Sequence, residues 1–210
     1  ESNVPGLHLI GSLIGYPLIK QAINQGYEVI EHILGNEVEP ADQVLIAEKL
    51  KRMPGEVNDN MVAIREALPL FQELSDPQFR ELIVESTLHM KKAGETIFKR
   101  NDYSNTLFSI VSGKVQVHLD DGKNFNLNPS DFFGEMGLIS GRRRTATTSA
   151  VGPTVLLETP CKQMQKLISS AESIKKTVDD TFMYRTLQNF FPGVAADQLK
   201  GLVNKSKLLR

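Results

Sequence analysis

Residues 132–148 of this chain read FFGEMGLISGRRRTATT, and this stretch decides how the rest is interpreted. Two aromatic residues lead into Gly134, a residue type that lets the backbone turn sharply or approach another group closely. Glu135 is a lone carboxylate among apolar residues, and the residues after it predict one short helical turn. Arg144 carries a planar guanidinium that fits two phosphate oxygens. A helix start with free N–H groups, a guanidinium and a carboxylate that accepts from hydroxyls together suit a sugar phosphate.

Short segments with strand-like alternation lie on both sides of this stretch. Alternating and β-branched residues predict strands over 96–98, 106–111, 114–119, 125–127, 145–150 and 154–158. Turn-forming residues separate these segments, and Asp120-Asp121-Gly122 predicts a hairpin turn. A strand about every 8 to 12 residues is typical of a small antiparallel sandwich or barrel.

Segments with helical periodicity flank the strands. Apolar residues recur at helical spacing over 18–34, 40–53, 61–68, 161–168 and 174–190. Ser75 or Asp76 predicts the start of another helix, because side-chain oxygens of these types cap free N–H groups. Residues 51–60 have the polar, Pro- and Gly-bearing composition of a linker, and residues 7–10 predict a short buried strand. This order of segments predicts an α+β fold.

The composition excludes several classes of protein. Lys and Arg total 24 and Asp and Glu total 25, so the net charge of −1 argues against a nucleic-acid partner. The longest apolar runs fall short of the about 20 residues that a membrane helix needs. Cys161 is the single cysteine, which excludes an intrachain disulfide and a cysteine-based zinc site and fits a reducing, cytoplasmic location. The 4 histidines lack metal-ligand spacing and no nucleophile motif is present, so we expect no metal and no catalytic residue.

The stretch from 132 to 148 resembles the phosphate-binding cassette of the cyclic nucleotide-binding domain family. The family pattern is Phe-Gly-Glu-(Leu/Met)-(Ala/Gly)-Leu, followed a few residues later by Arg-(Ser/Ala/Thr)-Ala-Thr, and residues 133–138 and 144–147 meet every fixed position. Arg143 stands where the family often has Pro, so we expect a less rigid turn. With the upstream strands the resemblance covers residues 66–186. It implies an antiparallel, jelly-roll-like β-roll of about eight strands flanked by helices, with helical N- and C-terminal extensions.

The resemblance also implies roles for individual residues. Arg144 pairs with the cyclic phosphate, and Glu135 accepts a hydrogen bond from the ribose 2′-hydroxyl. The remaining binding positions of the cassette are Phe133, Gly134, Met136, Thr145 and Ala146. The helix from Ile174 onward resembles a lid that closes on the base, with Tyr184 or Arg185 as candidates to stack on it. The hydroxyl of Thr145 can reach a guanine amino group, which leaves both cAMP and cGMP open as ligands.

Residues 2–35 resemble a different family, the thioredoxin-reductase-like pyridine nucleotide-disulfide oxidoreductases. In their second flavin-binding motif a strand ends in Gly-Asp, and the Asp holds the flavin. In this chain Ser12 follows Gly11, so that Asp is missing, and an ordinary strand-turn-helix is the alternative interpretation. If the resemblance holds, FAD belongs to a parent protein and no cofactor site forms in this chain. The chain has neither a starting Met nor a signal peptide, so we expect it to begin inside a larger protein.

We expect three segments along the chain. Residues 1–60 form an N-terminal helical segment, a candidate flavoprotein remnant with a linker, and residues 61–186 form the cyclic nucleotide-binding domain. Residues 187–210 form C-terminal helices. Residues 71–88 can be laid over 191–208 in register, which predicts the start of a second copy of the domain. The alternative is that two amphipathic helices look alike.

The preferred function is therefore a regulatory module for signal transduction. It binds cAMP or cGMP and couples occupancy through the lid helix to an attached or partner effector domain, without catalysis and without a nucleic-acid or membrane partner. Two alternatives stay open at this point. One is the regulatory tail of an FAD- and NAD(P)-dependent oxidoreductase, and the other is a ligand-free β-roll that serves as an interaction module.

Overall fold

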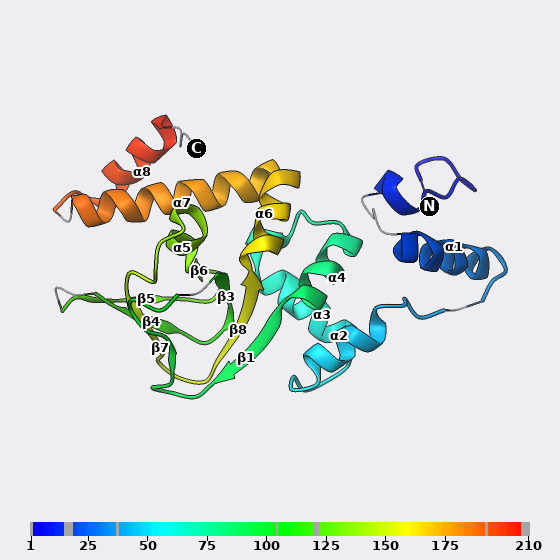
Figure 1. Cartoon of the computed structure of the whole chain (residues 1–210), viewed down its shortest axis with the longest axis horizontal. Coiled ribbons are helices and arrows are strands. Elements are labelled where there is room, and N and C mark those ends of the chain that lie inside the picture. The colour runs from blue at the N-terminus through cyan, green and yellow to red at the C-terminus, as the bar shows by residue number, and fades with distance from the viewer. Residues whose placement is uncertain are drawn as a thin grey trace. The chain divides into compact units, whose positions relative to one another are not determined.

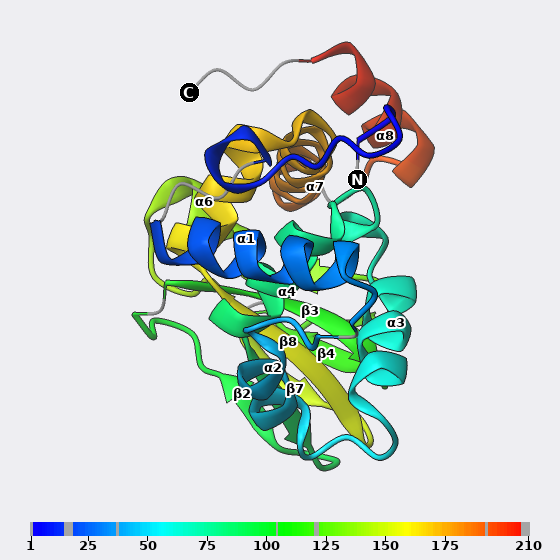
Figure 2. The ribbon, with the colours of Figure 1, turned by 90° about the vertical axis from the view of Figure 1, so that its right-hand side faces the viewer.

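The computed structural model describes residues 2–14, 19–36, 38–103, 105–119, 122–191 and 193–206. The chain divides into two compact units, Glu1–Glu48 and Lys49–Arg210, whose elements are labelled in Figures 1 and 2. The division lies before the polar stretch in which the sequence suggested a linker. Within the described residues, no helix combines the length and the apolar character that crossing a membrane requires.

The first unit is helical. It contains a 3-10 helix, η1 (Gly11–Ile14), helix α1 (Ile19–Ile33) and most of helix α2 (Gln43–Leu50), which is shorter than the segment 40–53 predicted for it. The strand predicted over 7–10 does not form. The described part of this unit offers no second strand to pair with it, and an isolated strand leaves its backbone groups unsatisfied. The N–H of Gly11 instead donates to Oε1 of Gln25, 2.7 Å away on α1.

The second unit contains an antiparallel β-roll made of two sheets. The sheets are four-stranded, with strand orders β1-β8-β3-β6 and β2-β7-β4-β5. The strands are β1 (Thr87–Lys91), β2 (Thr96–Phe98), β3 (Thr106–Ser112), β4 (Val115–His118), β5 (Asn124–Leu127), β6 (Phe132–Phe133), β7 (Thr147–Ala150) and β8 (Thr154–Pro160). The six strands predicted between residues 96 and 158 are confirmed, and β1 and β6 were missed. Residues 120 and 121 of the predicted hairpin turn lie outside the described residues, although β4 and β5 pair antiparallel on either side of it.

The inner faces of the two sheets meet in an apolar core that includes the cassette. Phe133 and Ala146 belong to one buried cluster with Phe108, Ile110, Val115, Val117, Leu127 and Leu156. The rings of Phe108 and Phe133 stack with centroids 5.3 Å apart. Burying an aromatic side chain of this size contributes about 1.5–3 kcal/mol to stability. The core therefore fixes both ends of the cassette relative to the roll.

Helices surround the roll within the second unit. They are α3 (Val57–Ala67), the 3-10 helix η2 (Pro69–Phe71), α4 (Asp76–Glu85), α5 (Glu135–Ser140), α6 (Cys161–Ser170), α7 (Glu172–Phe190) and α8 (Ala196–Lys205). Ser75 caps α4 as predicted, and its N–H donates to Oε1 of Gln78 at 3.0 Å. The prediction of a linker reaching residue 60 is wrong, because α3 already begins at Val57. Its buried residues Met61 and Ile64 give it an apolar face.

Helices α4 and α8 correspond under the register that lays 191–208 over 71–88. Each is 10 residues long, and each begins and ends at the equivalent position. Leu199 and Val203 are buried at the positions equivalent to Phe79 and Ile83. Phe191, however, is 52% exposed where Phe71 is fully buried. The start of a second copy therefore stays a prediction, now with matching helix bounds.

Candidate functional site

The cassette is a tight connection between strand β6 and helix α5. Gly134 precedes the helix with a φ of 93°, in the left-handed region, and Gly141 ends it with a φ of 64°. A Cβ added to Gly134 would lie 2.4 Å from Nη1 of Arg144, whereas one added to Gly141 would meet nothing within 4 Å. Glycine at 134 is therefore required both by the backbone conformation and by the close approach of the arginine.

Arg144 is buried behind the cassette and held by backbone and aromatic groups. It is 3% exposed, and its Nη2 donates to the carbonyl of Thr106 at 2.8 Å and to the Thr106 hydroxyl at 3.0 Å. Its Nη1 donates to the carbonyl of Gly134 at 3.2 Å, and its guanidinium carbon lies 4.2 Å from the centre of the Phe98 ring. Burial lowers the pKa of Arg144, while the charges of Glu158, Glu135 and Asp102 oppose that shift.

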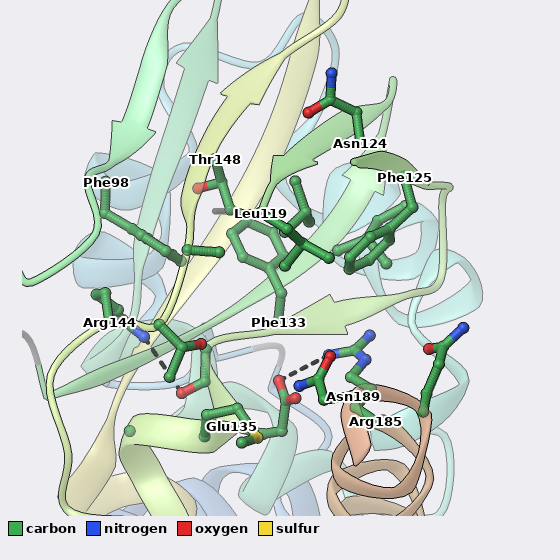
Figure 3. Close-up of a pocket in the computed structure, with 18 of the residues that line it drawn as sticks. Phe98, Leu119, Asn124, Phe125, Phe133, Glu135, Arg144, Thr148, Arg185 and Asn189 are labelled. Atoms are coloured by element: carbon green, nitrogen blue, oxygen red, sulfur yellow. Dashed lines mark hydrogen bonds and ion pairs between the residues drawn. The ribbon is translucent and has the colours of Figure 1, made fainter. Parts of the chain in front are cut away.

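Glu135 is also buried and is paired with helix α7. The residue is 1% exposed, and its Oε2 accepts from Nη1 of Arg185 at 2.7 Å. Nη2 of the same arginine donates to the carbonyl of Phe132 at 2.9 Å. Figure 3 shows Arg185 reaching from α7 to the carboxylate. One of the two candidates to stack on a base, Arg185, therefore joins α7 to the cassette.

One cavity of about 350 Å³ brings the predicted residues together. Its lining includes the cassette residues Phe133, Gly134, Glu135, Met136, Arg144, Thr145 and Ala146. Of the two lid candidates only Arg185 lines this cavity. Tyr184 instead lines an adjoining depression with Lys200 of α8, and Arg185 lines both hollows. The structure therefore gives no support to Tyr184 as a group that contacts a ligand in this cavity.

The wall of the cavity away from the cassette is mostly apolar. Val117, Leu119, Phe125 and Leu127 line it from β4, β5 and their ends, and Thr148 lines it from β7. Asn124 of β5 and Gln188 and Asn189 of α7 add polar groups. Sequence reasoning missed these residues, because alternation predicts which residues share a face but not which cavity that face lines. A group that is charged at one end and flat and apolar at the other fits this lining.

A chain of hydrogen bonds runs from Arg144 across the sheet that contains β3, β8 and β1. The Thr106 hydroxyl donates to Oε1 of Glu158 at 2.8 Å, and Oε2 of Glu158 lies 2.6 Å from Nε2 of His89. The hydrogen bond with His89 is the main cause that lowers the pKa of Glu158. The Thr106 hydroxyl and the charge of Arg144 act in the same direction, and burial acts against them. Thr106 and Glu158 thus position the arginine, and no sequence motif marked either of them.

Metal binding and thiol chemistry are two further possibilities for the side chains that the structure describes. Among the residues that the structure describes, no group of three His, Cys, Asp or Glu side chains is placed to hold a metal ion. Cys161 is buried at the start of α6, and burial raises the pKa of its thiol. A raised pKa keeps a thiol protonated and unreactive.

Comparisons with known proteins agree with this geometry. The family model described as the cyclic nucleotide-binding domain matches residues 89–171. A cyclic nucleotide-gated potassium channel of Rhizobium etli is 34% identical over 138 residues, which cover 66% of this chain and 38% of the channel. The chain spans between 32% and 38% of the length of this and two further potassium channels that it matches.

Solved structures share the fold. The regulatory domain of Toxoplasma gondii PKA, in a co-crystal with cAMP, matches with a TM-score of 0.52 at 18% identity, covering 71% of this chain and 59% of that one. The regulatory subunit of a cAMP-independent protein kinase A from Trypanosoma brucei matches with a TM-score of 0.52 at 16% identity, covering 65% and 47%. Because one of these proteins is described with cAMP and the other as cAMP-independent, the fold by itself does not decide the ligand.

The resemblance of residues 2–35 to a flavin-binding motif gains no support from these comparisons. The strand on which that motif depends is also absent, since residues 7–10 are irregular. The expectations of FAD and of an oxidoreductase parent rested on that motif alone and are left without support.

Proposed function

We propose, from the match of residues 89–171 to the cyclic nucleotide-binding domain family, that the chain binds cAMP or cGMP and passes ligand occupancy to an attached or partner effector domain. The observation that carries the proposal is that Glu135 and Arg144 line one cavity. Arg144 would pair with the cyclic phosphate, and Glu135 would accept from the ribose 2′-hydroxyl. The N–H groups near Gly134, Met136, Thr145 and Ala146 would complete the cradle.

The cassette fits a phosphate diester in shape as well as in charge. The missing side chain at Gly134 leaves the backbone and the guanidinium of Arg144 within reach of the same group. Phe98 covers the guanidinium, and less water near a cation strengthens its attraction for an anion. The apolar wall of β4 and β5 would receive the base.

Helix α7 is the element through which occupancy would be reported. Arg185 of α7 is bonded to Glu135 and to the Phe132 carbonyl, so a ligand that fills the cassette acts directly on the anchor of this helix. A ligand shifts an equilibrium between lid positions only by the difference in its affinity for them. We therefore propose that the nucleotide binds more tightly to the form in which α7 lies over the cavity.

The output domain is a matter of proposal too, since the match covers about a third of the related channels. We propose a cytoplasmic module that regulates a neighbouring domain and performs no catalysis itself.

One observation favours a second candidate, a ligand-free interaction module. The donors of Arg144 already bond to the carbonyls of Thr106 and Gly134, so the protein itself partly occupies the group meant for phosphate.

Titration calorimetry with cAMP and cGMP separates the two candidates. The proposed function predicts saturable binding of at least one nucleotide with a stoichiometry of one per chain, and 5′-AMP serves as the non-cyclic control. If neither nucleotide gives a detectable heat of binding and neither changes the melting temperature, the ligand-free module would be favoured.

A further inference from the structure

Thr148 places a hydroxyl in the apolar wall of the cavity. It lies in β7, opposite Val117 of β4 and Phe98 of β2 in the sheet register, and it is 2% exposed. Figure 3 shows Thr148 between Phe98 and Leu119, on the wall that faces the cassette across the cavity. A buried position among apolar side chains normally carries an apolar residue such as valine, which has the same shape as threonine.

The hydroxyl of Thr148 has no hydrogen-bond partner in the part of the chain that the structure describes. The neighbouring hydroxyls of the same strand do have partners. Oγ1 of Thr147 accepts from the N–H of Arg100 at 3.1 Å, and Oγ of Ser149 lies 2.8 Å from Nε2 of His118. A buried hydroxyl without a partner costs free energy, so its presence at the wall of a cavity points to a partner that enters from outside.

The position of Thr148 indicates which part of a nucleotide would meet it. The groups suited to the phosphate and the ribose, Arg144 and Glu135, lie on the cassette side of the cavity (Figure 3). The wall around Thr148 is the apolar one, which suits a purine ring. A purine edge carries ring nitrogens and an exocyclic group, and a threonine hydroxyl can both donate and accept. The hydroxyl can change direction by rotation about χ1 between staggered rotamers.

We infer that the Thr148 hydroxyl hydrogen-bonds the base of the bound cyclic nucleotide. The inference rests on the proposed function and adds to it a base-contacting residue on the roll, independent of the lid. In the bound state this bond gives a partner to a hydroxyl that is buried without one when the ligand is absent.

Two substitutions at this position isolate the hydroxyl. Thr148→Val keeps the shape and removes the hydroxyl, and Thr148→Ser keeps the hydroxyl and removes a methyl group. Calorimetry would compare both with the unmodified chain, using cAMP, cGMP and two base-edited analogues. The analogues are 7-deaza-cAMP, which lacks N7, and purine riboside 3′,5′-cyclic monophosphate, which lacks the 6-substituent.

We expect Thr148→Val to weaken binding of the preferred nucleotide by about fivefold to tenfold, and Thr148→Ser to weaken it less. The unmodified chain and Thr148→Val should have equal affinity for the analogue that lacks the contacted atom. The melting temperature of nucleotide-free Thr148→Val should equal or exceed that of the unmodified chain, which shows that any loss of binding is not a loss of folding.

Equal affinity of Thr148→Val and the unmodified chain for every nucleotide would overturn the inference. An equal loss for every nucleotide and analogue would also overturn it, because the hydroxyl would then serve the sugar phosphate. Both results require that the unmodified chain binds a cyclic nucleotide. If it binds none, the proposed function fails first, so the two failures are distinguishable.

Discussion

Arg185 Nη1 donates to Glu135 Oε2 at 2.7 Å, so helix α7 is bonded to the cassette at a residue that is only 1% exposed. A buried carboxylate needs a charged partner, and here the partner comes from an element fifty residues further along the chain. The state of α7 and the state of the binding cassette are therefore linked through one ion pair.

Removing this ion pair should loosen the lid and weaken binding. Arg185→Ala leaves Glu135 buried without its guanidinium, and α7 loses its bond to the Phe132 carbonyl. Because apparent affinity falls with the fraction of the binding-competent form, we expect about tenfold weaker nucleotide binding and faster amide hydrogen exchange in α7. Lys176→Ala, at an exposed position of the same helix, is the control. Unchanged affinity and unchanged exchange in Arg185→Ala would show that the ion pair does not hold the lid.

Removing the guanidinium of Arg144 should affect binding far more than removing a neighbouring one. Arg144→Ala takes away a charge-assisted contact with the phosphate worth about 1.5–3 kcal/mol, so we expect about tenfold to hundredfold weaker binding by calorimetry. Arg142→Ala, at an exposed position of the same arginine run, is the matched control and should bind normally. Equal affinities of the two variants would mean that the phosphate is held elsewhere.

Alanine at two glycines of the cassette separates backbone strain from close approach. Gly141→Ala should lower the unfolding free energy by about 1–2 kcal/mol. The only cause is the left-handed φ of 64°, because no atom lies within 4 Å of the new Cβ. Gly134→Ala costs more in backbone strain, because a φ of 93° lies outside the narrow left-handed region of L residues, and it also drives its Cβ into Nη1 of Arg144. We expect a clearly larger loss of unfolding free energy in urea for Gly134→Ala, together with weakened nucleotide binding. Similar losses in both variants would mean that the arginine moves aside without cost.

The cassette was predictable from the sequence because its residue types each answer a local requirement. Gly134 is needed for a left-handed turn, and Glu135 is a lone carboxylate among apolar residues, whereas the family pattern was needed to single out Arg144 from its arginine run. The strands were predictable for the same reason, since alternation is a local pattern. The two-residue strand β6 was too short to show one.

The contacts that complete the site depend on tertiary structure and were not predictable. Arg185 was one of two candidates to stack on the base, and its bond to Glu135 had no signal in the sequence, because the register of α7 on the cassette sets this partner. The carbonyl of Thr106 bonds Arg144, yet a carbonyl is present at every residue and leaves no signal in the sequence. The strand predicted over residues 7–10 does not form, although its local pattern suits a strand, because the described part of that unit contains no strand to pair with it.

The chain of hydrogen bonds behind Arg144 should make stability depend on acid. Glu158 has a lowered pKa in the folded protein, mainly because of its hydrogen bond with His89, so the unfolded chain binds its proton more tightly. Its contribution is therefore fully present above the unfolded pKa of about 4.3 and is lost as the pH falls through the lower folded value. Glu158→Gln removes the ionisable group, so its unfolding free energy should lose less between about pH 5 and pH 3 than that of the unmodified chain.

The same substitution tests whether Glu158 positions Arg144. At pH 7 Glu158→Gln keeps an acceptor for the Thr106 hydroxyl but loses the charge, so we expect it to cost about 1 kcal/mol of stability and a few-fold in nucleotide affinity. Urea titrations between about pH 5 and pH 3 measure how steeply the unfolding free energy falls with pH. Glu85→Gln, at an exposed position of α4, is the control. Calorimetry at pH 7 gives the affinity. If Glu158→Gln and the unmodified chain lose stability in parallel with falling pH, the carboxylate does not carry the acid dependence. If affinity is also unchanged, the bonds through Thr106 do not position the arginine.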